Sequence, residues 1–331
     1  WTQLGVKIGL WVAYALLMAL TGFVSAWLAI RARPDSADGS TIRINGDVVE
    51  VGKSVSSKTA RRVAVVISLI VGVIFGSQFN ANWSEILLMF NAQSFGTTDP
   101  QFGLDNGFYV FVLPGLKLVL AAVAMLLGVG LVFSVVTHVL MGGIRITMPV
   151  NGRGLFSITK RCRRQLGIWL MLNMFAWAVR QMIGVFDQLT VQGSRITGAS
   201  YTAVHANIPV TFIMAALTAI LGVVLGIWLM RSHTLEGQAS IGVRASAALK
   251  AWRVPVTSIA VVVVVGLVLT VAWPVLLQLF RVNPNAQEME STYIQRNIDA
   301  TRAAYGLDKL KTEQYKVTDK GEQGALAKEG D

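Results

Sequence analysis

Charged residues are scarce in this chain of 331 residues. Asp, Glu, Lys and Arg make up 14% of it, compared with about 25% in an average soluble domain. Hydrophobic residues make up 53%, and the mean hydropathy is +0.56. The sequence therefore predicts that lipid, and not water, surrounds much of the chain.

Cysteine is almost absent, and the motifs of common catalytic sites are missing. The single cysteine, Cys162, excludes an internal disulfide framework and a cysteine-based metal cluster. Its basic neighbours, Lys160 to Arg164, are compatible with palmitoylation and also with an unmodified thiol. Neither His-Glu-x-x-His nor Gly-x-x-x-x-Gly-Lys-Ser/Thr occurs, so zinc hydrolysis and nucleotide-driven transport lack their usual signals.

Histidine is rare as well, with three in the chain. Ser200 and His205 lie five residues apart in one loop, whereas a nucleophile and its base usually come from two separate elements. His138 and His233 lie at the same ends of two apolar runs and could ligate one haem or metal, but isolated histidines at helix ends are more often caps. We expect no enzymatic activity, no cofactor and no metal site.

Long apolar runs are what the sequence has in abundance. A helix needs about 20 apolar residues to cross a bilayer, and lipid leaves no water to satisfy an open backbone. The sequence predicts an all-α, polytopic transmembrane bundle with spans at Leu4–Ile30, Val63–Phe79, Phe108–Val139 (interrupted by Pro114), Leu166–Val185, Ile208–Met230 and Val254–Phe280. Because Trp1 is followed almost at once by the first run, we expect a fragment, in which six spans are a minimum.

Basic residues account for the net charge of +11, and they fall in alternate loops. The loops after the first, third and fifth spans are basic, whereas the intervening loops hold Glu85, Asp99 and Asp105 or Asp187, Arg195 and His205. This positive-inside pattern predicts that the basic loops are cytoplasmic and that the tail after Arg281 is extracytoplasmic. Anionic headgroups of the plasma membrane explain the charge without nucleic acid.

Short elements are expected between the spans. Two arms of alternating, β-prone residues around Asn45-Gly46 predict a β-hairpin. A similar pattern around Asn151-Gly152 predicts a second hairpin more weakly, because Pro149 lacks an N–H to donate to a strand pairing. The spacing of Trp83, Ile86, Leu87 and Phe90 predicts an amphipathic helix. The sequence also predicts a helix over Met289–Tyr305, with Gly306 as its C-cap. We expect two regions: a bundle over residues 1–281, and the start of an extracytoplasmic region over 282–331 that is disordered beyond Leu310.

Glycines recur at four-residue spacing in three spans, at Gly5 and Gly9, Gly72 and Gly76, and Gly222 and Gly226. Small residues at this spacing let transmembrane helices approach closely. They support a packed bundle and are compatible with self-association.

One charge stands out inside a predicted span. Arg180 lies five residues, or about 7 Å, from the outer end of its span, and Asp187 follows seven residues later on nearly the same helix face. Intramembrane charges are candidates for function. Arg180 can also be structural, held by Asp187 or by headgroups that its long side chain reaches, and both interpretations stay open.

Several runs resemble a known family. They are Asn91–Gly103, Phe108–Pro114, Gly198–Thr202, Tyr293–Ile298 and Thr301–Leu307, and in this order they are similar to the uncharacterised protein family (UPF) number 0182, which consists of multipass bacterial membrane proteins. The resemblance implies a plasma-membrane bundle of about seven helices followed by a large extracytoplasmic domain, with no assigned activity. From the resemblance we expect that the family's first helix and nearly all of its outer domain lie outside this sequence, and the sequence after Leu310 does not resemble that domain.

Two functions remain in competition. The leading hypothesis is a non-enzymatic membrane anchor or scaffold for an extracytoplasmic domain, with envelope proteins or a second copy as partners. The alternative is a transporter or channel component, which normally shows several polar groups near the middle of the membrane. A polar cavity that reaches mid-membrane would favour the alternative.

Overall fold

The structure, a computed structural model, describes residues 2–32, 40–44, 47–51, 56–146, 156–191, 197–232, 241–307 and 310. It contains six helical segments that are long and apolar enough to cross a membrane, which confirms the predicted multispan architecture. Their bounds are Gln3–Arg31, Ser57–Ser77, Phe108–Leu140, Lys160–Leu189, Ala203–Arg231 and Trp252–Val282.

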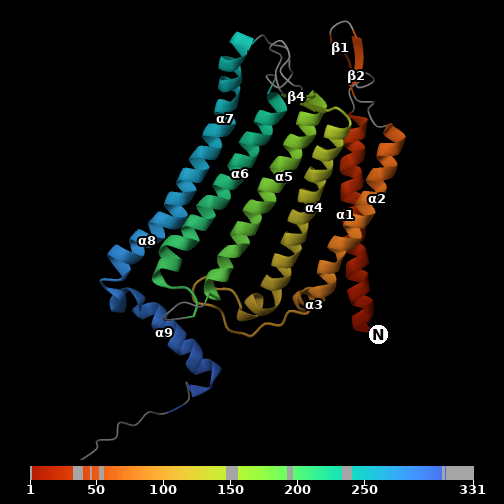
Figure 1. Ribbon diagram of the computed structural model, residues 1–331. Helices are drawn as coiled ribbons and strands as arrows, with labels where there is room; N and C mark the ends of the chain where they lie inside the picture. The colour runs from red at the N-terminus through yellow and green to blue at the C-terminus, as the bar shows by residue number, and fades with distance from the viewer. Residues whose placement is uncertain are drawn as a thin grey trace, which may run out of the picture.

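The six spans lie side by side in the order α2, α1, α4, α5, α6, α7 (Figure 1). The helices are α1 (Thr2–Arg31), α2 (Ser57–Ala81), α4 (Leu113–Leu140), α5 (Lys160–Gly184), α6 (Ile208–Arg231) and α7 (Ile241–Leu267). Because each span packs mainly on its neighbours in the row, only 6% to 28% of the most apolar window of each is buried. The spans therefore leave many hydrophobic side chains exposed, as helices that face lipid do.

Glycines bring neighbouring helices together at two of the three predicted places. A side chain at Gly72 would collide with the carbonyl oxygen of Ala15 in α1, and one at Gly222 would collide with Met174 in α5. Gly5 and Gly9, in contrast, have no heavy atom within 4 Å of the position that a Cβ would take. The close approach of α2 to α1 and of α6 to α5 thus depends on missing side chains, whereas the glycines at the start of α1 face open space.

Hydrogen bonds also join the spans. The Tyr14 hydroxyl of α1 donates to the Ala122 carbonyl of α4 at 3.1 Å, and Asn173 of α5 donates to the Leu127 carbonyl of α4 at 3.1 Å. Gln181 of α5 donates to the Thr218 hydroxyl of α6 at 3.2 Å. Such bonds between transmembrane helices contribute on average about 0.6 kcal/mol each, so they fix the register of the row more than they hold it together.

Prolines widen three spans without breaking them. The π-helical turns Phe108–Val112, Ala203–Asn207 and Val268–Ala272 each end two residues before a proline, at Pro114, Pro209 and Pro274. Proline has no N–H and its ring crowds the carbonyl four residues earlier, and a π turn accommodates both within a continuous helix. The interruption predicted at Pro114 is therefore a wider turn; the helix does not break there.

Shorter elements occupy the two ends of the row. At one end, which we call the α9 end, lie α3 (Trp83–Phe90), α8 (Trp273–Leu277) and α9 (Ala286–Ala304) (Figure 1). The helices predicted around Trp83 and from Met289 are both present, and the predicted C-cap Gly306 has a φ of +68°. Residues 311–331, where disorder is predicted, lie outside the described residues.

The opposite end, which we call the hairpin end, carries two short antiparallel backbone pairings. β1 (Ser40–Ile44) pairs with β2 (Asp47–Val51), and β3 (Ile144–Ile146) pairs with β4 (Phe156–Ile158). The predicted turns at Asn45-Gly46 and Asn151-Gly152 lie outside the described residues, so neither predicted hairpin is described as a complete unit. The described fold is in essence helical.

Candidate functional site

The connection between α3 and α4, at the α9 end, is organised around two carboxylates. Asp99 accepts hydrogen bonds from the backbone N–H groups of Gln101, Phe102 and Leu104 at 2.8, 2.6 and 3.0 Å, and from the Tyr109 hydroxyl at 2.7 Å. Burial raises the pKa of Asp99, but these hydrogen bonds outweigh it, so the pKa is lowered overall. Asp99 is therefore ionised, and both of its carboxylate oxygens accept hydrogen bonds that fix the conformation of its own loop.

Asp105 organises the other half of the same connection. It accepts from the Ser94 hydroxyl at 2.5 Å, from the N–H groups of Phe95 and Gly96 at 3.0 and 3.1 Å, and from that of Gly107 at 2.7 Å. The hydrogen bond from Ser94, followed by those from the backbone, lowers the pKa of Asp105 to about 2. The loop before α4 is thus held in a defined conformation.

α9 is bound to two other loops at this end. The buried carboxylate of Glu290 accepts from the Tyr201 N–H at 3.1 Å, and Asn297 Nδ2 donates to the Thr197 carbonyl at 2.7 Å. Arg296 Nη1 donates to Gln101 Oε1 at 3.3 Å. The helix that follows the last span therefore rests on segments 89 to 195 residues away in sequence.

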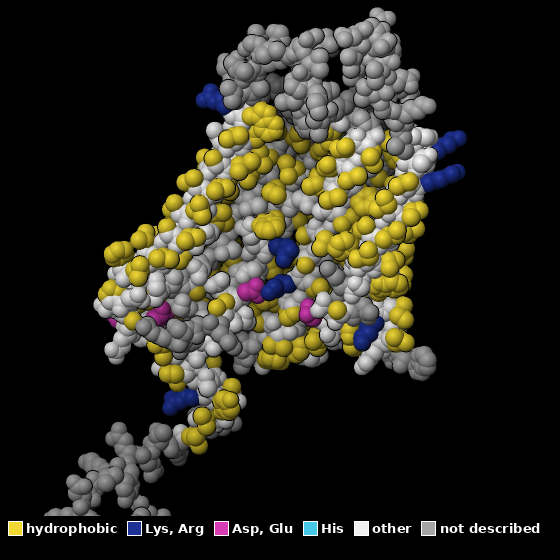
Figure 2. All heavy atoms as spheres, in the orientation of Figure 1, with side chains coloured by type: hydrophobic (Ala, Val, Ile, Leu, Met, Phe, Trp, Pro, Cys, Tyr) yellow, Lys and Arg dark blue, Asp and Glu magenta, His cyan; other side chains and the backbone are white. Residues whose placement is uncertain are grey.

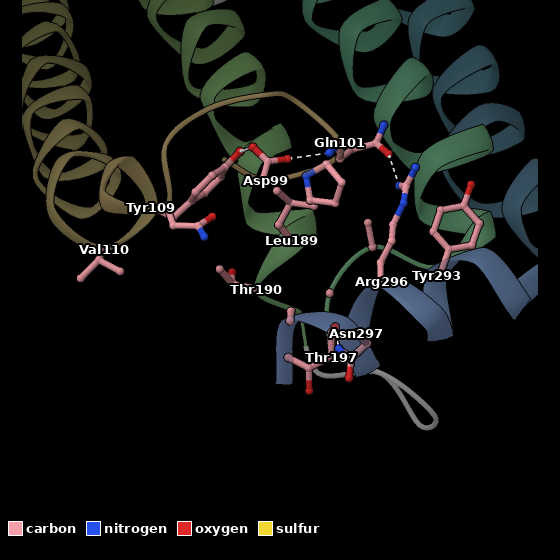
Figure 3. A pocket seen from close by; sticks show the side chains of 15 residues that line it. Asp99, Gln101, Tyr109, Val110, Leu189, Thr190, Thr197, Tyr293, Arg296 and Asn297 are labelled. Carbon is pink, nitrogen blue, oxygen red and sulfur yellow. Dashed lines mark hydrogen bonds between the residues drawn. The ribbon is translucent and has the colours of Figure 1, made fainter. Parts of the chain in front are cut away.

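These three segments line a cavity of about 340 Å³ that is open on one side (Figure 3). Asp99 and Gln101 contribute from the loop before α4, and Tyr109 contributes from the π turn Phe108–Val112. Thr190 and Thr197 come from the connection between α5 and α6, and Tyr293, Arg296 and Asn297 come from α9. Figure 3 shows the Gln101–Arg296 hydrogen bond crossing from the loop to α9 at one side of the cavity. Four of the five runs on which the family resemblance rests contribute residues to its lining; Thr301–Leu307 does not.

Asp99 is the one carboxylate among the described residues that line the cavity. Asp99 is saturated by its own loop, and Arg296 lies 5.5 Å from the centre of the Tyr293 ring. Burial raises the pKa of Tyr293, and the charge of Arg296 only partly offsets this, so its hydroxyl stays neutral. Within the described residues, no group of three His, Cys, Asp or Glu side chains is placed to hold a metal ion. Hydroxyl, amide and guanidinium groups make up the rest of the polar lining, and groups of these kinds can donate hydrogen bonds to a polar ligand.

Arg180 and Asp187, the residues singled out in the sequence, do not pair with each other. Asp187 instead binds Lys117 of α4, whose ammonium lies 2.8 and 2.9 Å from its two carboxylate oxygens. Arg180 is exposed on α5. Its span continues to Leu189, beyond the predicted end at Val185, so Arg180 lies nine residues, or about 14 Å, from that end.

Lys117 was missed by the sequence prediction, although it lies within the predicted third span. It is the one charged residue of α4. Its partner could not be inferred, because the two residues are 70 positions apart. Figure 2 shows basic and acidic side chains together in the middle of one broad face, with hydrophobic side chains on both sides of them.

The other candidate residues from the sequence that the structure describes are buried, hydrogen-bonded or stacked on a neighbouring ring. Cys162 is fully buried, and His138 is buried with Nε2 3.0 Å from Gln165 Oε1. Ser200 Oγ accepts from the Ala203 N–H at 3.2 Å, whereas His205 stacks on Tyr201. His233 lies outside the described residues, so the structure does not describe the His138–His233 pair.

Comparison with known proteins gives one family. The model of the uncharacterised protein family UPF0182 matches residues 1–331. A UPF0182 protein of Bifidobacterium adolescentis is 77% identical over 99% of this chain and 30% of its own length. One from Kocuria rhizophila is 35% identical over 96% of this chain and 30% of its own, and one from Corynebacterium diphtheriae is 32% identical over 91% and 28%. The chain thus spans less than a third of these relatives. No solved structure matches it significantly.

Proposed function

We propose that this chain, which belongs to the uncharacterised protein family UPF0182, is the membrane anchor of a longer protein and the scaffold on which an extracytoplasmic domain rests. The proposal includes the plasma membrane as its location, with the α9 end outside. It assigns no catalytic step to the described residues.

The attachment of α9 is the observation that carries this proposal. A simple tether needs only a helix and a linker, but here the segment after the last span is bound to two other connections through Glu290, Asn297 and Arg296. Val282, where the last span ends, is fully buried. A domain that follows α9 would therefore leave the membrane in a fixed direction, which is what a scaffold requires.

The arrangement of the spans supports the same proposal. Each helix packs on its neighbours through glycines, hydrogen bonds and apolar contacts, and the two cavities described lie at the ends of the row. The second of them has a volume of about 400 Å³ and is lined mainly by Val223, Ile227, Trp228 and Val254. Neither has the polar lining at mid-membrane that a transport route needs.

A transporter or channel component is the second candidate. It is favoured by the charges inside the spans, Lys117, Arg180 and Asp187, because intramembrane charges often mark a substrate or ion route. In this alternative, Arg180 contacts the solute and the α9 contacts are incidental.

The test separates the two functions with two sets of variants. Spin labels at Thr97→Cys and Arg302→Cys, both exposed in the wild type, should report a narrow distance distribution between the loop and α9. Combining them with Glu290→Ala and Asn297→Ala should broaden it, because α9 then loses two of its contacts with the neighbouring loop. Gln295→Ala is the matched control on α9, because the hydrogen bond of Gln295 is to Asp299 of the same helix.

The opposite outcome is also defined. Proteoliposomes of the full-length protein should show no ion current above that of protein-free vesicles. A current that Arg180→Gln abolishes, while the Glu290 and Asn297 variants leave it unchanged, would overturn the anchor in favour of the transporter.

A further inference from the structure

Three charged side chains lie within the spans in the halves of α4 and α5 nearest the α9 end. Lys117 belongs to α4, Arg180 to α5, and Asp187 to the turn Val185–Leu189 that continues α5. Charges in this position are expensive in lipid, and Figure 2 shows basic and acidic side chains together in the middle of one face. This face can lie against lipid only if each of these charges is neutralised by a charge of opposite sign.

The ion pair between Lys117 and Asp187 is internally balanced. One ammonium binds both oxygens of one carboxylate, at 2.8 and 2.9 Å. The three residues together have a net charge of +1, which resides on Arg180. No described residue forms a hydrogen bond or an ion pair with Arg180, and its side chain is exposed.

The surroundings of Arg180 leave room for a ligand. Gly184 lies one turn nearer the α9 end on the same helix face, and apart from the backbone of its own helix nothing lies within 4 Å of the position that a Cβ would take. Trp177, one turn in the other direction, is 58% exposed. The guanidinium therefore has an open approach from the α9 end and an exposed apolar surface on its other side.

We propose that Arg180 binds the phosphate of an anionic phospholipid in the leaflet at the α9 end, whose acyl chains lie along Trp177 and the exposed face of α5. A phosphodiester has one negative charge and so neutralises the cluster. Its oxygens accept two parallel N–H bonds from a guanidinium. A lipid phosphate can reach this guanidinium, because Arg180 lies within a span and its side chain is exposed on the surface that would face the bilayer. This inference does not depend on the anchor function.

The experiment measures stabilisation by lipid. The purified full-length chain in neutral detergent receives phosphatidylglycerol, phosphatidylcholine or inorganic phosphate at constant ionic strength, since salt screens charges. We expect phosphatidylglycerol to raise the melting temperature by a few degrees, and the other two to have little effect. Native mass spectrometry should find one retained phosphatidylglycerol molecule.

A charge series tests the assignment to Arg180. Arg180→Gln should abolish the shift, Arg180→Lys should retain part of it, and Lys117→Gln should also abolish it because the net charge falls to zero. Asp187→Asn should enlarge the shift, because the net charge rises to +2. Arg302→Gln is the control: it removes a charge from exposed α9, away from the cluster, and should retain the full shift.

Three results would overturn the proposal. An undiminished phosphatidylglycerol shift in Arg180→Gln would remove the arginine from the site. An equal shift with inorganic phosphate would replace the lipid with a soluble anion. A dimer that is lost in Arg180→Gln, with no response to lipid, would assign the arginine to an acidic group of a second copy.

Discussion

Lys117 and Asp187 join α4 to the end of α5 at the residue scale. Their side chains are 46% and 37% exposed, but the pair lies within the spans, where water does not screen it. We therefore expect a coupling above the range of about 0.2–1 kcal/mol that exposed ion pairs show in water. Lys117→Gln and Asp187→Asn should each lower stability in neutral detergent without anionic lipid, and the double variant should lose less than the sum. Reversible unfolding of the four proteins measures the coupling.

The control for this cycle is the pair that the sequence suggested. Arg180→Gln and Asp187→Asn should be additive within about 0.5 kcal/mol, because the two residues do not contact each other. A larger coupling for Arg180 than for Lys117 would contradict the observed pairing.

Asp105 gives the connection before α4 a defined dependence on pH. Its pKa is lowered from 3.8 to about 2 in the folded protein. A lowered folded pKa means that the contribution is complete above about pH 4 and is lost as the pH falls toward 2. Hydrogen exchange of residues 94–107 should therefore accelerate over this range. Asp105→Asn should exchange faster at neutral pH, and a variant as protected as the wild type would contradict the role of the carboxylate.

Hydrogen bonds between a carboxylate and the backbone of its loop could not be predicted from the sequence. The acidic residues Asp99 and Asp105 were noticed only as charges of an outer loop, because their hydrogen-bond donors are backbone groups whose positions depend on the fold. The contacts of α9 with Tyr201 and Gln101 join residues 89 and 195 positions apart. A helical period predicts α9 itself, but no local pattern predicts the loops on which it rests.

At the scale of elements, glycine determines where helices touch. Gly72→Leu should place a side chain against the backbone of α1 and lower stability by about 1–3 kcal/mol. Gly222→Leu should have a similar effect between α6 and α5. Thermal unfolding in detergent measures both.

Gly9→Leu provides the matched control for these variants. It makes the same substitution in a span, but nothing lies within 4 Å of the new Cβ, so the change should stay within about 0.5 kcal/mol. A loss at Gly9 as large as that at Gly72 would mean that the start of α1 has a partner outside the described contacts.

The spans themselves were predictable because their signal is local. An apolar run of sufficient length must be helical in lipid, so six spans could be predicted from the lengths and positions of the apolar runs. Four-residue glycine spacing predicted two real contacts and one open surface, because spacing does not reveal which face of a helix meets a neighbour. Likewise, Pro114 marked the position of an irregularity, but only the structure shows a π turn instead of a break.

At the scale of the whole molecule, the row of spans has two chemically different ends. The hairpin end holds Arg31, Arg61, Arg62 and the basic start of α5, whereas the α9 end holds the two carboxylate-centred turns and the cavity. This asymmetry supports the orientation that the sequence predicts, with the hairpin end in the cytoplasm. In the proposed orientation, an extracytoplasmic domain that follows α9 would meet the α9 contacts.

Orientation in the membrane gives the last prediction. Cysteines are introduced at Thr97, exposed at the α9 end, and at Ser56, exposed at the hairpin end. A membrane-impermeant maleimide should label Thr97→Cys in intact cells and label Ser56→Cys only after permeabilisation. Both are placed in a Cys162→Ser background, although Cys162 is fully buried and should itself react little. If Ser56→Cys reacts in intact cells while Thr97→Cys is protected, the α9 end is cytoplasmic, and both the orientation and an extracytoplasmic scaffold are wrong.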